Sequence, residues 1–581
     1  MLNQYFSADR IINHICKVRV KQAGARHDRQ YIGRLAGHIT EREPDHPFYK
    51  LTPPRRLWAA FRPKYRKAGL NPDLFALKNA IRTLREREPG KAWVVALNHY
   101  IAAIRERVFN GREVSFSPPT INAEPKRKGG HEYRALSRFE VDDNLILCLF
   151  ANYLRDSFDP LFSASSYAFR AACNGRIPTH HDAFEAVWKL KVNSGKLKLY
   201  VAECDIRGFF DTVDHGVAWA VFQSAAHEVN LHPRAELLFR AYLDCYSFPR
   251  TVLTGAEPEL KRRDPKGVFK WPESDLAKLH STNPRQLRIG VSQGGALSGI
   301  IANLILNEAD KVVKAEGVRL GAEIHYYRFC DDMLLISPSR KHCKLVFAAY
   351  LRKLTGLKLI YHDPKRTLIY GKVHWDHKSK SPYLWSGAQW FGAVPWVQFV
   401  GYQIRYDGLV RPRNESVAKQ CQKLVETTNQ LKFGLIRQAK LGTVKATGMQ
   451  ALTSLQARLI AQGVGRVKVG GAGPKPMCWA AGYKGLDQKP FIDRGLRSFD
   501  QARAKQIQRF DNIKVEFGSG VKKRSINRRE LGKFALSYVS QFINRGGPKL
   551  IQNPWKPGNL KERVKNWVFR LVTKLADLRR H

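Results

Sequence analysis

The sequence predicts an α+β protein in which one mixed domain is flanked by basic, mainly helical regions. Between residues 116 and 407, apolar stretches of strand length alternate with amphipathic stretches of helix length, which is the pattern of an α+β domain. Beyond residue 411 the chain becomes helical and basic. A length of 581 residues and a hydrophobic fraction of 44% suffice for two to four domains with apolar cores.

The charge of the chain points to a polyanionic partner. Lysine and arginine number 99 against 50 aspartate and glutamate, a formal net charge of +49, and nucleic acid is the first candidate for such a surface. An anionic membrane is the competing partner, but no apolar run is long enough to span a bilayer. The N-terminus also lacks the features of a signal peptide. We therefore expect no membrane partner and a cytoplasmic location.

The cysteines and histidines indicate neither a disulfide framework nor a zinc ribbon. The nine cysteines are scattered without a CxxC pair, and we expect reduced, mostly buried thiols. His374 with His377, and the pair His180 and His181, are potential metal ligands. Because no second ligand pair lies near either group in the sequence, we interpret both as exposed polar loops.

Four regions follow one another along the chain. Residues 1–110 form a basic extension with helical stretches at 74–87 and 93–108. Residues 111–408 contain the segments that carry chemistry, and residues 409–500 follow them. Residues 501–581 contain 20 lysines and arginines against 5 acidic residues, interleaved with aromatic side chains. Such a region suits contact with nucleic acid.

The first chemical segment places a carboxylate at the end of a strand. Residues 200–215 read YVAECDIRGFFDTVDH, and a strand over 198–204 delivers Asp205 to its end. A helix start follows, in which Asp211 is suited to cap the helix and Asp214 lies three residues on. A carboxylate at a strand end is expected to face a cleft.

A second pair of carboxylates occupies a predicted hairpin tip. Residues 326–337 read YYRFCDDMLLIS, where apolar runs at 325–329 and 333–336 flank Asp331 and Asp332. Crowded carboxylates are costly unless cations neutralise them, and Mg²⁺ prefers such hard oxygen ligands. Two Mg²⁺ ions, with Mn²⁺ as a substitute, would activate a 3′-hydroxyl and stabilise a leaving pyrophosphate.

Between these two segments lies a glycine turn that leads into a helix. Residues 290–304 read GVSQGGALSGIIANL, and Gln293 is followed by two glycines that permit close approach of the backbone to a ligand. The helix after the turn presents one apolar face at i, i+3, i+4 and i+7, formed by Leu297, Ile300, Ile301 and Leu304. We expect this face in the core and the head of the helix near a base and sugar.

These segments, together with VQFVGYQI at 397–404, resemble in their order the palm of reverse transcriptases, most closely the bacterial group II intron and retron-like lineage. That family reads approximately DIKGFFDNIDH, PQGGxxSPLLANIxLNxLD and YADD, against DIRGFFDTVDH, SQGGALSGIIANLILNEAD and FCDD here. The likeness extends upstream through EPKRKGGHEYRAL and SASSYAFRAACNG and downstream through GLKLIYHDPKRTLI, so that it covers about 290 residues.

The resemblance implies a right-hand polymerase fold. Fingers and a palm with an antiparallel sheet would occupy residues 111–408, a helical thumb and connector 409–500, and a basic nucleic-acid-binding region 501–581. It makes Asp205, Asp331 and Asp332 the metal ligands, with a backbone carbonyl from Ile206. Lys365 matches a lysine that protonates the departing pyrophosphate.

The resemblance also implies a nucleotide site. Phe210 takes the position of an aromatic gate that excludes a ribose 2′-hydroxyl and so favours dNTPs, and Lys126 and Arg134 correspond to cations that hold the triphosphate. Gln293 and Gly294 would line the site. Two positions depart from the family pattern, because glycine stands at 299 where proline is usual and cysteine at 330 where alanine is usual. Loss of the proline is expected to loosen that helix.

Two basic stretches are expected to contact nucleic acid. The stretch 416–437 resembles the thumb, whose lysines would follow a duplex backbone. Charge runs in the tail lie among aromatic residues, which favours a surface for structured RNA or single strands. The expected contact residues are Lys419, Lys423, Lys522, Lys523, Arg524, Arg528 and Arg529.

The function that follows is RNA-directed DNA synthesis, in which a 3′-end is extended with dNTPs on an RNA template, itself a structured or dedicated non-coding RNA, to give a DNA product. A partner protein or a second copy of the chain is a further candidate partner. The terminal regions, which lack a nuclease motif, resemble those of bacterial antiphage-defence reverse transcriptases. Two alternatives stay open: an intron-type maturase or RNA-binding scaffold, and template-independent or protein-primed synthesis on the same palm.

Overall fold

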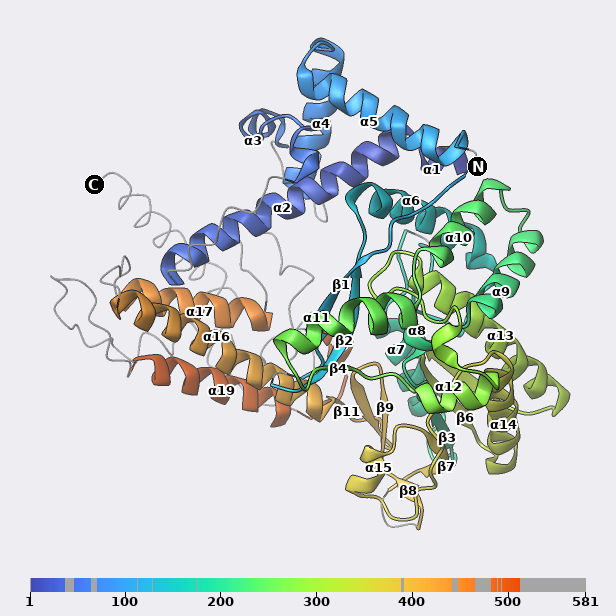
Figure 1. The fold of residues 1–581 in the computed structure, drawn as a ribbon. Coiled ribbons are helices and arrows are strands. Elements are labelled where there is room, and N and C mark those ends of the chain that lie inside the picture. The colour runs from blue at the N-terminus through green and yellow to red at the C-terminus, as the bar shows by residue number, and fades with distance from the viewer. Residues whose placement is uncertain are drawn as a thin grey trace. The chain divides into compact units, whose positions relative to one another are not determined.

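The protein is described by a computed structural model, shown in Figure 1, that covers residues 2–36, 46–63, 71–111, 113–127, 129–173, 175–387, 391–440, 448–464, 482–487, 489–492 and 494–511. The chain forms two compact units. The first contains the described residues within 1–19, 46–61 and 76–400, and the second those within 20–45, 62–75 and 401–581.

The helices and strands follow in three groups. The N-terminal group is α1 (Leu2–Tyr5), α2 (Ala8–Ala36), η1 (Pro47–Tyr49), α3 (Arg55–Trp58), η2 (Ala59–Phe61), α4 (Pro72–Arg87) and α5 (Ala92–Phe109). The central group is β1 (Thr120–Pro125), β2 (Glu132–Arg138), α6 (Val141–Phe158), η3 (Asp159–Leu161), α7 (His180–Asn193), β3 (Tyr200–Cys204), α8 (Phe209–Thr212), α9 (His215–Glu228), α10 (Arg234–Asp244), η4 (Phe248–Ala256), α11 (Glu257–Arg263), β4 (Val268–Phe269), α12 (Glu273–His280), η5 (Pro284–Gln286), α13 (Ser298–Arg319), β5 (His325–Phe329), β6 (Asp332–Ser337), α14 (Arg340–Gly356), α15 (Lys372–Asp376), β7 (Lys380–Trp385), β8 (Ala393–Val394) and β9 (Trp396–Phe399). The last group is β10 (Tyr402–Arg405), β11 (Val410–Pro412), α16 (Asn414–Lys440), α17 (Gly448–Val464), η6 (Lys484–Leu486) and α19 (Arg494–Asp511).

The main sheet of the first unit has the order β5-β6-β3-β7-β8. Strands β5, β6, β3 and β7 are antiparallel to their neighbours, and β8 runs parallel to β7. Strand β6 is an apolar run whose side chains from Met333 to Ile336 are all buried, because it lies in the interior of the sheet. Helix α14 packs against β3, β6 and β7, and α13 packs against α14, as Figure 1 shows. The sheet and these two helices form the core that supports the site.

A second, smaller sheet of the first unit has the strand order β1-β2-β4. Strands β1 and β2 form an antiparallel hairpin in which Glu124 pairs with Arg134, and β4 joins β2 in parallel at Tyr133 and Phe269. Most residues of β1 are exposed or half-buried, so one side of this hairpin stays open to solvent.

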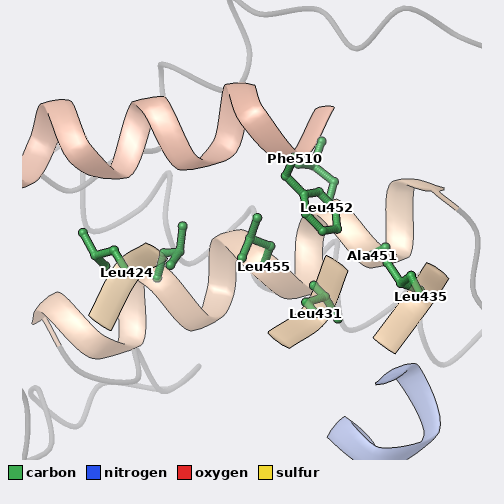
Figure 2. Close-up of a cluster of buried hydrophobic side chains, with 8 residues drawn as sticks. Leu424, Leu431, Leu435, Ala451, Leu452, Leu455 and Phe510 are labelled. Carbon is green, nitrogen blue, oxygen red and sulfur yellow. The ribbon is translucent and has the colours of Figure 1, made fainter. Parts of the chain in front are cut away.

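The second unit is built mainly from long amphipathic helices. Figure 2 shows leucines of α16 and α17 pointing toward one another, with Phe510 of α19 beside them. Leu424, Leu431 and Leu435 fall at helical spacing along α16 and are fully buried. Within this unit, β10 and β11 form an antiparallel pair from Tyr402–Pro412 to Ile404–Val410.

Most predicted elements are present near their expected bounds. The helical stretches expected at 74–87 and 93–108 correspond to α4 and α5, and the expected strand at 198–204 corresponds to β3. The helix predicted after the glycine turn is α13, and its four expected core residues are buried. Within the parts of the chain that the structure describes, no helix combines the length and apolarity needed to cross a bilayer.

Three local expectations were wrong. The residue that caps a helix is Asp214, whose Oδ1 accepts from the backbone N–H of Val217 at 2.9 Å, whereas Asp211 lies inside the short helix α8. His374 is buried in α15 and its Nδ1 lies 2.7 Å from Thr367 Oγ1, so it is not in an exposed loop. His180 and His181 open α7.

The thiols agree with the expectation of reduced cysteines. All eight described cysteines are free, and Cys16, Cys204, Cys245 and Cys343 are buried. Burial raises the pKa of Cys204 to about 12, which keeps this thiol protonated and unreactive at neutral pH. These side chains therefore serve as small apolar groups in the core.

Candidate active site

The backbone brings the three predicted acidic residues to one end of the main sheet. Strands β3 and β6 are antiparallel, and their ladder ends where Cys204 pairs with Met333. The next residue of each strand along this register is Asp205 on one side and Asp332 on the other. Strands β5 and β6 pair up to Phe329 and Asp332, so the hairpin turn consists of two residues, Cys330 and Asp331.

The turn itself has an unusual backbone. Cys330 adopts a positive φ of 58°, a conformation that glycine, asparagine and aspartate tolerate better than other residues. The expected hairpin tip is thus confirmed with one refinement, since Asp332 is the first residue of β6 and Asp331 alone of the two carboxylates lies in the turn.

Asp331 has an environment that opposes its charge. Burial raises the pKa of the Asp331 carboxyl, and the negative charge of Asp205 raises it further, while Arg328 acts in the opposite direction. The mutual repulsion of Asp205 and Asp331 indicates that the two carboxylates lie near each other. Within the described ranges, no group of three or more His, Cys, Asp or Glu side chains is arranged closely enough to hold a metal ion.

Asp205 has two basic neighbours that sequence reasoning missed, Lys378 and His362. Its Oδ2 lies 3.5 Å from Lys378 Nζ and 3.4 Å from His362 Nε2. Burial lowers the pKa of His362, and Lys378 lowers it further, so the imidazole is neutral at pH 7 and Lys378 carries the opposing charge. The backbone N–H of Asp205 donates to Ser379 Oγ at 2.9 Å, and that of His362 donates to the Asp205 carbonyl at 3.0 Å. The sequence offered only one signal, that His362 lies in the resembling segment GLKLIYHDPKRTLI.

Lys365 and Ile206 belong to the same neighbourhood. The backbone N–H of Lys365 donates to the carbonyl of Ser379 at 3.2 Å, and the Lys365 carbonyl accepts from Ser381 N–H at 3.0 Å. The Lys365 side chain is exposed. Ile206 pairs with Tyr361 in an isolated bridge, and its side chain is buried. The roles predicted for Lys365 and for the Ile206 carbonyl stay predictions.

A buried network of polar side chains is hydrogen-bonded to the turn formed by Cys330 and Asp331, which we call the acidic turn. Arg328 and Asp310 form an ion pair in which both side chains are 0% exposed, with Arg328 Nη2 at 2.7 Å from Asp310 Oδ2 and Nε at 2.9 Å from Oδ1. Tyr326 Oη donates to the same carboxylate at 2.7 Å. Arg328 Nη1 donates to the carbonyl of Cys330 at 3.1 Å and to Asn303 Oδ1 at 3.1 Å. Sequence reasoning missed Arg328, although it stands two residues before the turn.

The candidate nucleotide site combines three segments. The carbonyl of Phe210 accepts from Val291 N–H at 2.7 Å, which joins the segment after β3 to the glycine turn. The carbonyl of Gln293 accepts from Ser137 N–H of β2 at 2.9 Å, which joins the glycine turn to the hairpin. Gly294 has a φ of 85°, so its conformation requires glycine, as the sequence predicted. Phe210 and Gln293 are therefore held close to the same hairpin.

The two predicted phosphate-binding cations lie on that hairpin. Lys126 follows β1 and Arg134 lies on β2, and both side chains are exposed. Lys126 Nζ is 3.9 Å from Glu132 Oε2, a weak contact across the hairpin. Both cations lower the pKa of Asp211, so their charges reach the residue next to Phe210.

Asp211 is a further residue that sequence reasoning placed incorrectly. Burial raises its pKa to about 7, against the influence of Lys126 and Arg134. Its Oδ1 is buried and accepts no hydrogen bond from the described residues, while its backbone carbonyl accepts from Trp271 Nε1 at 2.8 Å. A capping carboxylate accepts from the backbone at the start of its helix, whereas Asp211 Oδ1 is buried and accepts no hydrogen bond from the described residues.

The residues predicted to contact nucleic acid divide between described and undescribed parts. Lys419 and Lys423 are exposed on α16 and lie one turn apart. Lys522, Lys523, Arg524, Arg528 and Arg529 lie outside the described residues. The predicted roles of all seven residues stay predictions.

With this geometry in place, comparison with known proteins identifies the central segment. Residues 125–404 match the family model described as "Reverse transcriptase (RNA-dependent DNA polymerase)". This segment is similar to reverse transcriptase domains. It confirms the predicted α+β class and right-hand polymerase fold, with the β5-β6-β3-β7-β8 sheet as the palm of the domain. The match covers this central segment, and its description is that of an RNA-dependent DNA polymerase.

Comparisons beyond this domain are distant. No curated protein matches the sequence. Among solved structures, apo telomerase from Candida tropicalis matches with 12% identity and a TM-score of 0.33, covering 75% of this chain and 73% of that one. A form of the same telomerase truncated from its C-terminal domain matches with 14% identity and a TM-score of 0.29, covering 51% of this chain. This chain spans only 55% of that truncated form.

Proposed function

We propose that the protein is an RNA-directed DNA polymerase that extends a 3′-end with dNTPs. The observation that carries the proposal is the strand register at the end of the palm sheet, which makes Asp205 and Asp332 neighbours and puts Asp331 in the adjoining turn. A reverse transcriptase domain that keeps its acidic residues at this position retains the groups needed for phosphoryl transfer.

The chemistry of the side chains at this end of the sheet suits divalent cations, although among the described residues these side chains are not arranged as a metal-binding group. Three carboxylates offer hard oxygen ligands, and the repulsion between Asp205 and Asp331 is the kind that bound cations relieve. Asp205, Asp331 and Asp332, with the Ile206 carbonyl, would hold two Mg²⁺ ions, or Mn²⁺ in their place, which supply charge neutralisation and Lewis-acid activation when bound. Lys378 is near enough to balance the charge of Asp205.

The residues around the glycine turn would bind and select the nucleotide. Lys126 and Arg134 are exposed cations on one hairpin, suited to hold a triphosphate. Phe210 is half-buried with its ring against Phe209, at a centroid distance of 5.3 Å, so the ring has a support from which to exclude a 2′-hydroxyl. Gln293 and Gly294 would meet the base and sugar. Lys365 would give a proton to the leaving pyrophosphate.

Template and product would contact the basic surfaces. Lys419 and Lys423 lie exposed along one side of α16, a geometry that suits successive phosphates, and Lys522, Lys523, Arg524, Arg528 and Arg529 would add contacts from the tail. The proposed partners are an RNA template, itself structured or a dedicated non-coding RNA, and its DNA product. A partner protein or a second copy of the chain is part of the same proposal. Sequencing of the nucleic acid that copurifies with the protein tests the template.

Incorporation of dNTPs by the purified protein tests the activity. We expect incorporation on an RNA template with a DNA primer that requires Mg²⁺ and falls to background in Asp331→Ala and Asp332→Ala. Asp376→Ala is the matched control, because this exposed carboxylate lies on α15, away from the turn in sequence and outside the donor set. Equal incorporation by the wild type and both aspartate variants would overturn the proposal.

The finer assignment is a cytoplasmic bacterial enzyme of the group II intron and retron-like lineage that acts in antiphage defence. Its support is the motif resemblance and the basic terminal regions. Phage challenge of cells with the wild type or Asp331→Ala tests it, since a defence polymerase loses protection with the carboxylate. A maturase or scaffold would keep both its RNA affinity and its cellular effect in that variant. Incorporation without a template, or onto the protein itself, would indicate the untemplated or protein-primed alternative.

A further inference from the structure

Phe169 combines solvent exposure with a strained backbone. Its side chain is 46% exposed, although most large aromatic residues of the reverse transcriptase domain are buried. Its φ is 54°, in the left-handed region that is a rare conformation for a bulky residue. An aromatic side chain kept exposed at the expense of backbone strain is typical of a functional position.

The surrounding loop holds Phe169 in this conformation. The guanidinium of Arg170 donates to Asp159 Oδ1 at 2.7 Å and to the carbonyls of Ser163 and Ser166 at 2.8 and 2.7 Å. On the other side, Asn303 Nδ2 of α13 donates to the carbonyl of Ala168 at 2.7 Å. Both neighbours of Phe169 are thus fixed by buried or half-buried hydrogen bonds. The ring is presented by a rigid support, which lowers the entropic cost of binding to it.

The loop joins Phe169 to the two segments of the candidate site. Arg328 N–H donates to the Ser165 carbonyl at 2.8 Å, and Tyr167 N–H donates to the Arg328 carbonyl at 3.0 Å, so the loop pairs with β5 two residues before the acidic turn. The ring itself covers Gly299, four residues after Gly295. A Cβ atom at position 299 would lie 2.4 Å from Phe169 Cδ1, which no side chain can accommodate without moving the ring.

The glycine at 299 has a consequence that the sequence did not suggest. Gly299 and its neighbours from Ser298 to Ile301 are buried in α13, so the start of this helix is closely packed, and the looser helix expected from the missing proline stays a prediction. The missing side chain makes room for the Phe169 ring. Position 299 and position 169 are coupled by packing, 130 residues apart.

We infer that the exposed face of Phe169 stacks on a base of the template strand. The inference rests on the proposed function, which places the primer end at the acidic turn and the incoming nucleotide at the glycine turn. The ring packs on Gly299 of the helix that follows the glycine turn, the backbone of its loop pairs with β5 next to the acidic turn, and the residue is 46% exposed. Aromatic rings bind bases of any sequence by stacking, which a template position requires. The Arg170 guanidinium is occupied by Asp159 and by carbonyls, so the aromatic ring, and not the adjacent cation, provides the contact.

The test uses the full-length protein and an RNA template that carries 2-aminopurine at or next to the position that pairs with the incoming nucleotide. Stacking on an aromatic ring changes the fluorescence of this base. We expect a protein-dependent fluorescence change with the wild type, its loss in Phe169→Ala, and its return in Phe169→Trp. The KM for template–primer should rise about tenfold in Phe169→Ala, with a smaller change in kcat. Gly299→Ala should act in the same direction by displacing the ring.

Phe391→Ala is the matched control, because this phenylalanine of the same domain is 74% exposed and lies outside the loop. A fluorescence change and a KM in Phe169→Ala that equal those of the wild type would overturn the inference. The results distinguish failure of the proposed polymerase activity from failure of the proposed stacking by Phe169. Loss of the signal in Phe169→Ala with no dNTP incorporation by the wild type refutes the polymerase and supports the stacking. Normal incorporation with a signal that is independent of Phe169 refutes the stacking alone.

Discussion

The acidic turn and the helices of the second unit are stabilised by different kinds of contact. The turn rests on the Arg328–Asp310 ion pair, in which both side chains are fully buried. Helices α16, α17 and α19 pack through leucines and Phe510. Apolar burial stabilises in proportion to area and tolerates rearrangement, whereas a buried ion pair costs desolvation but fixes the direction of each group. The chain thus has directional contacts where carboxylates must be positioned and apolar contacts where helices need only be held together.

The largest effect is expected from breaking the buried ion pair. Arg328→Ala leaves the Asp310 carboxylate buried without its cation and removes the donor to the Cys330 carbonyl, which should cost about 3–5 kcal/mol of unfolding free energy. Incorporation of dNTPs should fall by roughly 100-fold or more at a temperature where the variant is folded, because the turn loses its support. Urea unfolding and steady-state kinetics measure the two quantities.

A double variant separates positioning from stability at the same place. Arg328→Met combined with Asp310→Leu replaces the pair by apolar groups, which commonly restores stability. If Arg328 positions the turn, the double variant should recover its midpoint of unfolding and still incorporate slowly. Wild-type incorporation by a restored double variant would show that the ion pair contributes only to folding.

A second prediction concerns Asp211, whose buried Oδ1 accepts no hydrogen bond from the part of the chain that the structure describes. Its folded pKa of about 7 lies above its unfolded value, so the folded state binds more protons. The stabilising contribution of the proton bound to folded Asp211 is complete below the unfolded pKa near 4 and is lost as pH rises through 7. The unfolding free energy falls by about 4 kcal/mol at most over this range. Asp211→Asn, which is neutral at every pH, should reduce the difference in unfolding free energy between pH 5 and pH 8. If the difference between pH 5 and pH 8 is the same in the wild type and in Asp211→Asn, the prediction is wrong and the Asp211 carboxylate is in contact with solvent.

The smallest effect on dNTP incorporation is expected in the leucine core of the second unit. Leu431→Ala should lower the unfolding free energy by about 2–5 kcal/mol because it leaves a cavity between α16 and α17. It should leave kcat for dNTP incorporation within about twofold. Phe433→Ala on the same helix is the control, since its side chain is 63% exposed and its loss should change stability by less than about 0.5 kcal/mol. A larger kcat loss in Leu431→Ala than in Arg328→Ala would reverse the comparison between the two regions.

Much of the site could be predicted from the sequence, because its residues lie in short segments with local patterns. The alternation that ends at Asp205, the apolar runs around Asp331 and Asp332, and the glycine turn before α13 each depend on near neighbours. The supporting residues have no such pattern. Arg328 meets Asp310 across 18 positions, and Asp205 meets Lys378 only because β3 and β7 are neighbours in the sheet.

The sequence by itself determined the strands and helices of the reverse transcriptase domain, the order of its segments and the excess of positive charge, since periodicity and composition act over a few residues or over the whole chain. Only the tertiary structure decided that Asp214 rather than Asp211 caps a helix, that His374 is buried, and that Gly299 makes room for Phe169. The physical reason is that burial and close packing depend on which distant segments pack together, and the local spacing of residues does not determine this.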